Sequence, residues 1–126
     1  MNTGSRCLLG LGAVLLAACG QSEAELEDRL EWIYRDTGAI QCESDGLSIS
    51  EMRQQLDEAG IAVHDSACGA DGKMYTTVCG AASGRIGMFE ITASDLQTAA
   101  AMGFEPLNHL PEATRTPCPD DSRAAD

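Results

Sequence analysis

An uncharged apolar run at residues 7–18 most constrains what this chain can fold into. It follows Arg6 and ends in small residues, which is the layout of a secretory signal with a positive start, a short apolar centre and a small-residue cleavage site. The run is too short for a permanent membrane-spanning helix, which needs about 20 apolar residues. The sequence therefore predicts that residues 1–18 are removed and that residues 19–126 fold after export.

The apolar run closes with Leu-Ala-Ala-Cys, ending at Cys19, and this ending resembles the lipobox of bacterial lipoproteins. In that family a dedicated peptidase cuts before the cysteine once its thiol carries lipid, so the resemblance implies Cys19 as the lipidation site. Two or more acyl chains give stable attachment, because one chain anchors only marginally. An ordinary secretory signal cut after Gly20, and a cytosolic protein with an apolar first helix, are the alternatives.

The residues after the cysteine bear on which membrane holds the protein. Enteric lipoproteins that stay at the inner membrane carry Asp there, whereas this chain has Gly20 and Gln21. The resemblance therefore favours the periplasmic face of the outer membrane as the location.

The chain is strongly acidic, with 20 Asp and Glu against 8 Lys and Arg and a net charge of −12. Nucleic acids and anionic lipid headgroups select clusters of Lys and Arg, so neither is an expected partner. The acidic residues are spread along the chain, which predicts a solvated, self-repelling surface. Recognition of a basic partner is the alternative use of this charge.

The cysteines agree with export. With Cys7 lost in the signal and Cys19 lipidated, four remain: Cys42, Cys68, Cys79 and Cys118. An even number in a small exported domain predicts two disulfides, each contributing about 2–4 kcal/mol. A zinc site is the competing interpretation, but the chain has no C-x2-C pair, and His64 and His109 stand at no matching spacing. We expect neither a metal nor a cofactor.

Three Ser-x-x-Glu or Ser-x-x-Gln patterns, which are typical of helix starts, predict helices at residues 22–36, 48–59 and 94–102. Gly60 and Gly103 end the second and third of these helices. The first prediction has an alternative, since the Trp-Ile-Tyr sequence within it also suits a strand entering a turn.

Short strands are expected between the helices, at residues 39–42, 61–63, 74–78 and 85–91, with an Asp-Gly hairpin turn at 71–72. Strand, helix, glycine and strand thus occur twice. This order predicts an α+β fold: a small two-layer sandwich with an antiparallel or mixed sheet and two helices on one face, a variant of the ferredoxin-like plan. The predicted units are a tether and short helix at 19–38, the α+β domain at 39–110 and a loose C-terminal tail at 111–126.

The predicted hairpin also limits how the cysteines pair. Its turn at residues 71–72 places Cys68 and Cys79 at different levels of the two strands, although the Cα atoms of a disulfide must come within about 7 Å. Each of them is therefore expected to pair with Cys42 or Cys118.

Residues 68–79 have a Cys-Gly-x-Asp-Gly-Lys start and a C-x6-Tyr-x3-C spacing, which resemble the central signature of Kazal-type protease inhibitors. The resemblance implies a small hairpin on which Tyr75 packs, with an inhibitory loop just upstream. The chain departs from the family pattern, because no cysteine lies between Cys42 and Cys68 to brace such a loop. The family also has a helix where residues 80–91 predict turn and strand. A glycine-turned hairpin between two cysteines is the simpler interpretation.

No catalytic signature is present. The chain has no G-x-S-x-G and no H-E-x-x-H, and its single lysine, Lys73, has no serine three residues before it. We therefore predict no catalytic residues and a non-catalytic binding or support module, held in the envelope membrane by lipid on Cys19, with an envelope protein as its partner. A Kazal-like serine protease inhibitor and a periplasmic hydrolase with unidentified carboxylates are the alternatives.

Overall fold

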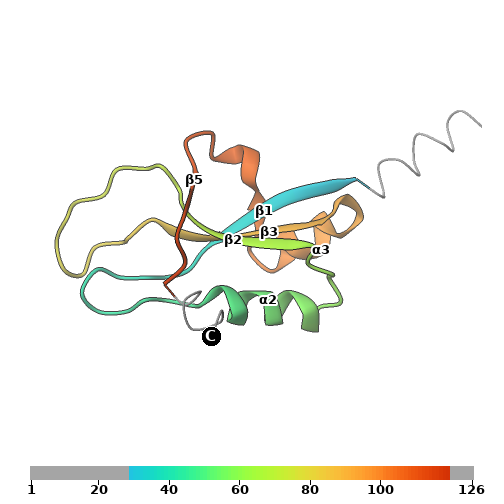
Figure 1. Ribbon diagram of the computed structural model, residues 1–126, viewed down its shortest axis with the longest axis horizontal. Helices are drawn as coiled ribbons and strands as arrows, with labels where there is room; N and C mark the ends of the chain where they lie inside the picture. Colours follow the sequence, from blue (N-terminus) through green and yellow to red (C-terminus); the bar gives the residue numbers. More distant parts are fainter. Residues whose placement is uncertain (1–28, 120–126) are drawn as a thin grey trace, which may run out of the picture.

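A computed structural model describes residues 29–119, so the predicted signal, the lipidation site and the start of the first predicted helix lie outside the described residues. Within them the chain forms a sheet and two α-helices (Figure 1). The strands are β1 (Leu30–Asp36), β2 (Asp65–Ala70), β3 (Arg85–Thr92), β4 (Glu105–Pro106) and β5 (Thr114–Thr116). The helices are α2 (Ile49–Glu58) and α3 (Leu96–Ala101), with 3-10 turns η1 (Ala93–Asp95) and η2 (Leu107–His109).

The five strands lie in the order β4-β1-β3-β2-β5, and every neighbouring pair is antiparallel. As a result β1 and β2 run in the same direction on either side of β3, and the chain passes between them through α2. In the same way β3 and β4 flank β1 and are joined through α3. The predicted α+β class is confirmed, and this arrangement is compatible with the ferredoxin-like plan.

One face of the sheet packs against both helices. Ile33 of β1 and Phe89 and Ile91 of β3 alternate with residues that point to the other face, as the pleat of a strand requires. They form one buried cluster with side chains of α2, α3 and the segments that follow these helices: Met52, Leu56, Ile61, Ala99 and Phe104. The two helices therefore lie on one face, as the sequence predicts.

The opposite face is covered by the chain after β4. Ile86, Met88 and Leu110 form a second buried cluster, against which Trp32 and Leu107 pack. We expected a loose tail from residue 111, but within the described residues β5 pairs with β2. The expectation failed because β2 has an open edge, which the β-branched threonines of β5 suit.

Helix α2 forms as predicted because its start is fixed locally. Ser48 is the N-cap: its Oγ accepts from the Glu51 amide at 3.1 Å, and Glu51 Oε2 accepts from the Ser48 amide at 2.8 Å. Met52 and Leu56, one turn apart, are both fully buried. Cap and apolar spacing thus indicate the same helix.

Other local predictions were wrong. The described part of the first predicted helix is strand β1, because β3 and β4 pair with its two edges. The third capping box does not form: Ser94 lies in η1, and Thr92 Oγ1 instead bonds Asp95 Oδ2 at 3.0 Å. Among the predicted strands, 39–42 contains only isolated bridges and 61–63 precedes β2.

Candidate functional site

The connection between β2 and β3, residues 71–84, is a long segment in which most residues are exposed, and we call it the braced loop. It projects from one end of the sheet (Figure 1, left). The hairpin strand predicted at 74–78 does not form, since these residues pair with no strand. The loop closes at its base instead, where the Asp71 amide donates to the Gly84 carbonyl at 2.9 Å.

Asp71 holds the loop from inside. Its side chain is buried, at 7% exposure, and its two oxygens accept from the Lys73 amide at 2.9 Å and from the Tyr75 hydroxyl at 2.5 Å. Gly84 has a φ of +76°, and a Cβ there would lie 2.6 Å from the Tyr75 ring. The tyrosine therefore packs on a backbone that only glycine allows.

A second brace comes from the segment between β1 and α2. The Gln41 side-chain amide donates to the carbonyls of Thr76 and Ala82, at 2.9 and 3.0 Å. Next to it, Cys42 forms a disulfide with Cys79, with a Cα–Cα distance of 5.0 Å. The braced loop is thus fixed at its base between Asp71 and Gly84, in its middle at Thr76, and at Cys79.

The second disulfide joins Cys68 of β2 to Cys118, with a Cα–Cα distance of 5.2 Å. The prediction that Cys68 and Cys79 take partners other than each other is confirmed. The predicted hairpin register was nevertheless wrong, because Cys68 pairs with Gly87 of β3 and Cys79 lies in the braced loop. No feature of the sequence indicates that Cys68 of β2 pairs with Gly87 of β3.

The outer part of the braced loop presents apolar side chains to solvent. Met74 is 96% exposed and Val78 is 52% exposed. The backbone amides of residues 74–77 donate to no other described residue, so these four N–H groups are free to bond a partner. A contiguous exposed apolar patch on a monomer often marks an interaction site.

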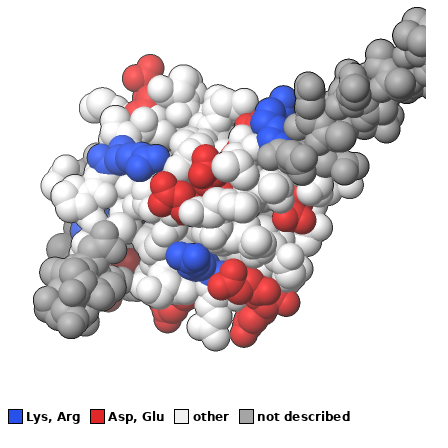
Figure 2. Space-filling view, turned by 45° about the vertical axis from the view of Figure 1, so that its right-hand side comes forward, with Lys and Arg blue, Asp and Glu red and all other residues white. Residues whose placement is uncertain are grey.

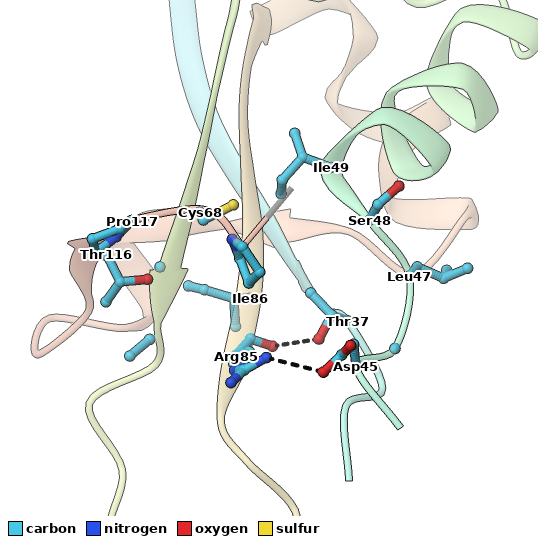
Figure 3. Close-up of a pocket in the computed structure, with 14 residues that line it drawn as sticks. Thr37, Asp45, Leu47, Ser48, Ile49, Cys68, Arg85, Ile86, Thr116 and Pro117 are labelled. Carbon is cyan, nitrogen blue, oxygen red and sulfur yellow. Dashed lines mark hydrogen bonds and ion pairs between the residues drawn. The ribbon is translucent and has the colours of Figure 1, made fainter. Parts of the chain in front are cut away.

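A hollow of about 340 Å³ lies beside the loop, between the start of α2 and the ends of β2 and β3. Figure 3 shows Arg85 and Asp45 facing each other at its rim, where Arg85 Nη1 and Asp45 Oδ1 are 3.7 Å apart. The Thr37 hydroxyl donates to the Arg85 carbonyl at 3.3 Å. The walls include Ile49 and Ile86, so the hollow suits a small apolar group with one polar contact.

A smaller hollow of about 270 Å³ is lined by polar groups that include Tyr34, Asp36, Asp71, Tyr75 and Glu105. Burial and the neighbouring Glu105 raise the pKa of Tyr34, whose hydroxyl donates to Glu105 Oε2 at 3.2 Å. Among residues 29–119 no group of three His, Cys, Asp or Glu side chains could hold a metal ion.

The histidines lie on different elements. His64 is exposed just before β2, and His109 lies in η2 with its Nδ1 3.6 Å from Glu105 Oε1. On the face shown in Figure 2, basic side chains lie among the acidic ones.

No family model, curated protein or solved structure matches this chain. No helix among the described residues has the length and apolar character needed to cross a membrane.

The hydrogen bond between Tyr75 and Asp71 leads to a testable titration. This bond is the main cause that raises the pKa of Tyr75 from 10.0 to about 12, with burial second. Because the folded-state pKa lies above the unfolded value, the bond stabilises the loop fully below pH 10 and this contribution is lost as the pH approaches 12.

The chain has two tyrosines, so Tyr34→Phe leaves Tyr75 as the only one to follow by tyrosinate absorbance. In this background we expect the midpoint well above 10, and Asp71→Asn should move it back toward 10. A midpoint unchanged by Asp71→Asn would contradict the assignment of Asp71 as the acceptor.

Proposed function

We propose that this chain is a non-catalytic, lipid-anchored module of the bacterial envelope that binds a partner protein through the braced loop. The observation that carries the proposal is the exposure of Met74 on a loop fixed by Asp71, Gln41 and the Cys42–Cys79 disulfide. A loop that is ordered before binding loses little conformational entropy when a partner covers it. An apolar side chain exposed on a loop that is fixed in this way is suited to binding a partner protein.

The position of the loop agrees with tethering at the other end of the sheet. The chain enters the domain at Leu30, the first residue of β1, whereas the braced loop lies at the opposite end (Figure 1). A lipid on Cys19 would therefore hold the entry end near the membrane and direct the loop away from it. Gly20 and Gln21 favour the periplasmic face of the outer membrane as the site of attachment.

The anchor is tested with Cys19→Ser in full-length protein expressed in a bacterial host. We expect the wild-type chain in the membrane fraction, with an intact mass that lacks residues 1–18 and carries acyl chains, because those chains hold it in the leaflet. The variant should lose the added mass and leave the membrane fraction. Unchanged mass and partitioning would refute the anchor. The same measurement with and without reductant reports the two disulfides.

Binding through the loop is tested by placing a photo-crosslinking amino acid at position 74 in the anchored protein. We expect a discrete adduct in intact cells, because the side chain at 74 is the most exposed apolar group described. The same probe at Asp57, exposed on α2, is the matched control and should give none. The adduct should also be lost in Cys42→Ser/Cys79→Ser, which removes a brace and keeps Met74. If the probes at positions 74 and 57 gave equal amounts of adduct, and the adduct persisted in Cys42→Ser/Cys79→Ser, the proposal would be contradicted.

A second candidate is inhibition of a serine protease, and the backbone amides of residues 74–77, which donate to no other described residue, favour it. Such a segment could lie in a protease cleft as a substrate does, with the Met74 side chain in an apolar pocket. The exposed residues lie within the Kazal-like signature rather than upstream of it, so the resemblance does not assign them. A purified domain that fails to inhibit serine proteases at micromolar concentration would exclude this candidate.

A further inference from the structure

A shallow apolar surface lies where the chain enters the domain, and we call it the tether face. It is lined by Leu30, Glu31, Trp32, Leu107 and Asn108. Leu30 is 42% exposed, which makes it one of three large hydrophobic side chains exposed among residues 29–119. The other two, Met74 and Val78, lie in the braced loop at the other end of the sheet.

The fold leaves Leu30 of this surface exposed, whereas Trp32 is half-buried and lies under the Arg115 guanidinium. Strand β4 pairs with β1 only at Ile33 and Tyr34, so the edge formed by residues 30–32 extends past it. Leu30 and Trp32 point to the same side of the sheet, because side chains alternate along a strand. Trp32 and Leu107 of η2 are both half-buried, both pack against the second core cluster and both line this surface.

The length of the preceding segment limits how far this surface can lie from a lipidated cysteine. Residues 20–29 separate Cys19 from Leu30 and span at most about 35 Å when fully extended. Because this segment joins the domain at Leu30 itself, the tether face is the part of the domain held closest to the anchor.

We propose that the tether face rests on the phospholipid bilayer, with Leu30, Trp32 and Leu107 at the level of the headgroups. The inference depends on the proposed lipid anchor. Tryptophan is favoured at membrane interfaces, because its ring is apolar and its N–H needs a polar neighbour. The Arg115 guanidinium lies over the Trp32 ring, 4.7 Å from its centroid. A positive charge would therefore also lie at the level of the headgroups.

The charge of the chain determines which lipids this contact suits. A net charge of −12 opposes approach to an anionic surface, so contact through apolar burial suits zwitterionic headgroups. We therefore expect the contact to form on phosphatidylcholine or phosphatidylethanolamine without any anionic lipid.

Trp32 is the only tryptophan of the chain and reports the contact directly. The test uses the mature lipidated protein in phosphatidylcholine vesicles that contain a doxyl quencher at either a shallow or a deep acyl position. We expect strong quenching of Trp32 fluorescence, greater with the shallow probe. Leu30→Asp should reduce the quenching by about twofold or more, because a charge at the interface weakens the apolar contact. Met74→Asp makes the same change at the far end and should leave quenching unchanged.

Vesicle flotation separates the two proposals. Protein that floats with the vesicles while Trp32 is unquenched would overturn the tether face and leave the anchor intact. Quenching that falls equally in Leu30→Asp and Met74→Asp would also overturn the tether face. Wild-type protein that fails to float would refute the anchor and, with it, this inference.

Discussion

Replacing Cys68 and Cys118 by serine should lower the free energy of unfolding by about 4 kcal/mol. The disulfide joins residues 50 positions apart, and opening a loop of that size restores much conformational entropy to the unfolded chain. Domains of this size are typically stable by about 5–15 kcal/mol in total, so the loss is a large fraction. Urea denaturation of the oxidised protein and the variant measures the difference.

The matched control is Cys42→Ser/Cys79→Ser, which opens a loop of 37 positions and has a similar effect on the unfolded chain. The two variants differ in the folded state. Cys118 follows β5, which carries Arg115 over the Trp32 ring, so its release should shift Trp32 emission to longer wavelength. The control pair lies at the braced loop and should leave the emission unchanged. Equal emission in both variants would contradict the view that this disulfide holds residues 107–118, which we call the C-terminal cover, on the sheet.

Local sequence predicts an element where all of its determinants lie within the element. In α2, the Ser48 cap, the Glu51 side chain and the buried Met52 and Leu56 are close in sequence, and the helix forms as predicted. Strand β3 is similar, because Ile86 and Met88 alternate with Phe89 and Ile91 and supply both cores.

Strand β1 shows where local signals are insufficient. The apolar residues of this segment also fit a helical spacing, and Ser22 with Glu25 gives a capping pattern. The strand forms because Leu30 pairs with Thr92, and Tyr34 with Glu105, residues far away in the sequence. Helix propensity is a weak prior that such tertiary pairing overrides.

The braced loop could not be predicted for the same reason. Asp-Gly is a strong hairpin signal, but here the Asp71 carboxylate turns inward to Tyr75. A Cβ on Gly72 would lie 2.4 Å from the Glu112 carbonyl oxygen, so the C-terminal cover packs directly on this glycine. Gln41 supplies a further contact from before α2. The sequence analysis singled out Asp71, Tyr75 and the cysteines, whereas it predicted neither the contacts of Gln41 nor the exposure of Met74.

Phe89→Ala is expected to destabilise the fold by about 3–5 kcal/mol, from lost burial and the cavity that remains. Phe89 is fully buried in the middle of β3, opposite Ile33 on one side and Ser66 on the other. Its ring meets Phe104 edge to face, with centroids 5.9 Å apart. Phe89→Leu keeps most of the volume and is the control, with an expected loss below about 1.5 kcal/mol. Urea denaturation followed by Trp32 fluorescence measures both.

The same substitution should loosen one helix more than the other. Phe104 follows α3, and its ring is covered on one face by the Arg35 guanidinium, 4.5 Å from the centroid. Arg35 also donates to Gln55 Oε1 of α2 at 2.7 Å, and the pKa of its guanidinium is lowered by burial. Without Phe89, the Phe104 ring that follows α3 loses its edge-to-face partner, whereas α2 keeps Met52 and Leu56 in the core. Hydrogen exchange should therefore show a larger loss of protection in α3 than in α2, and equal losses would contradict this role of the aromatic pair.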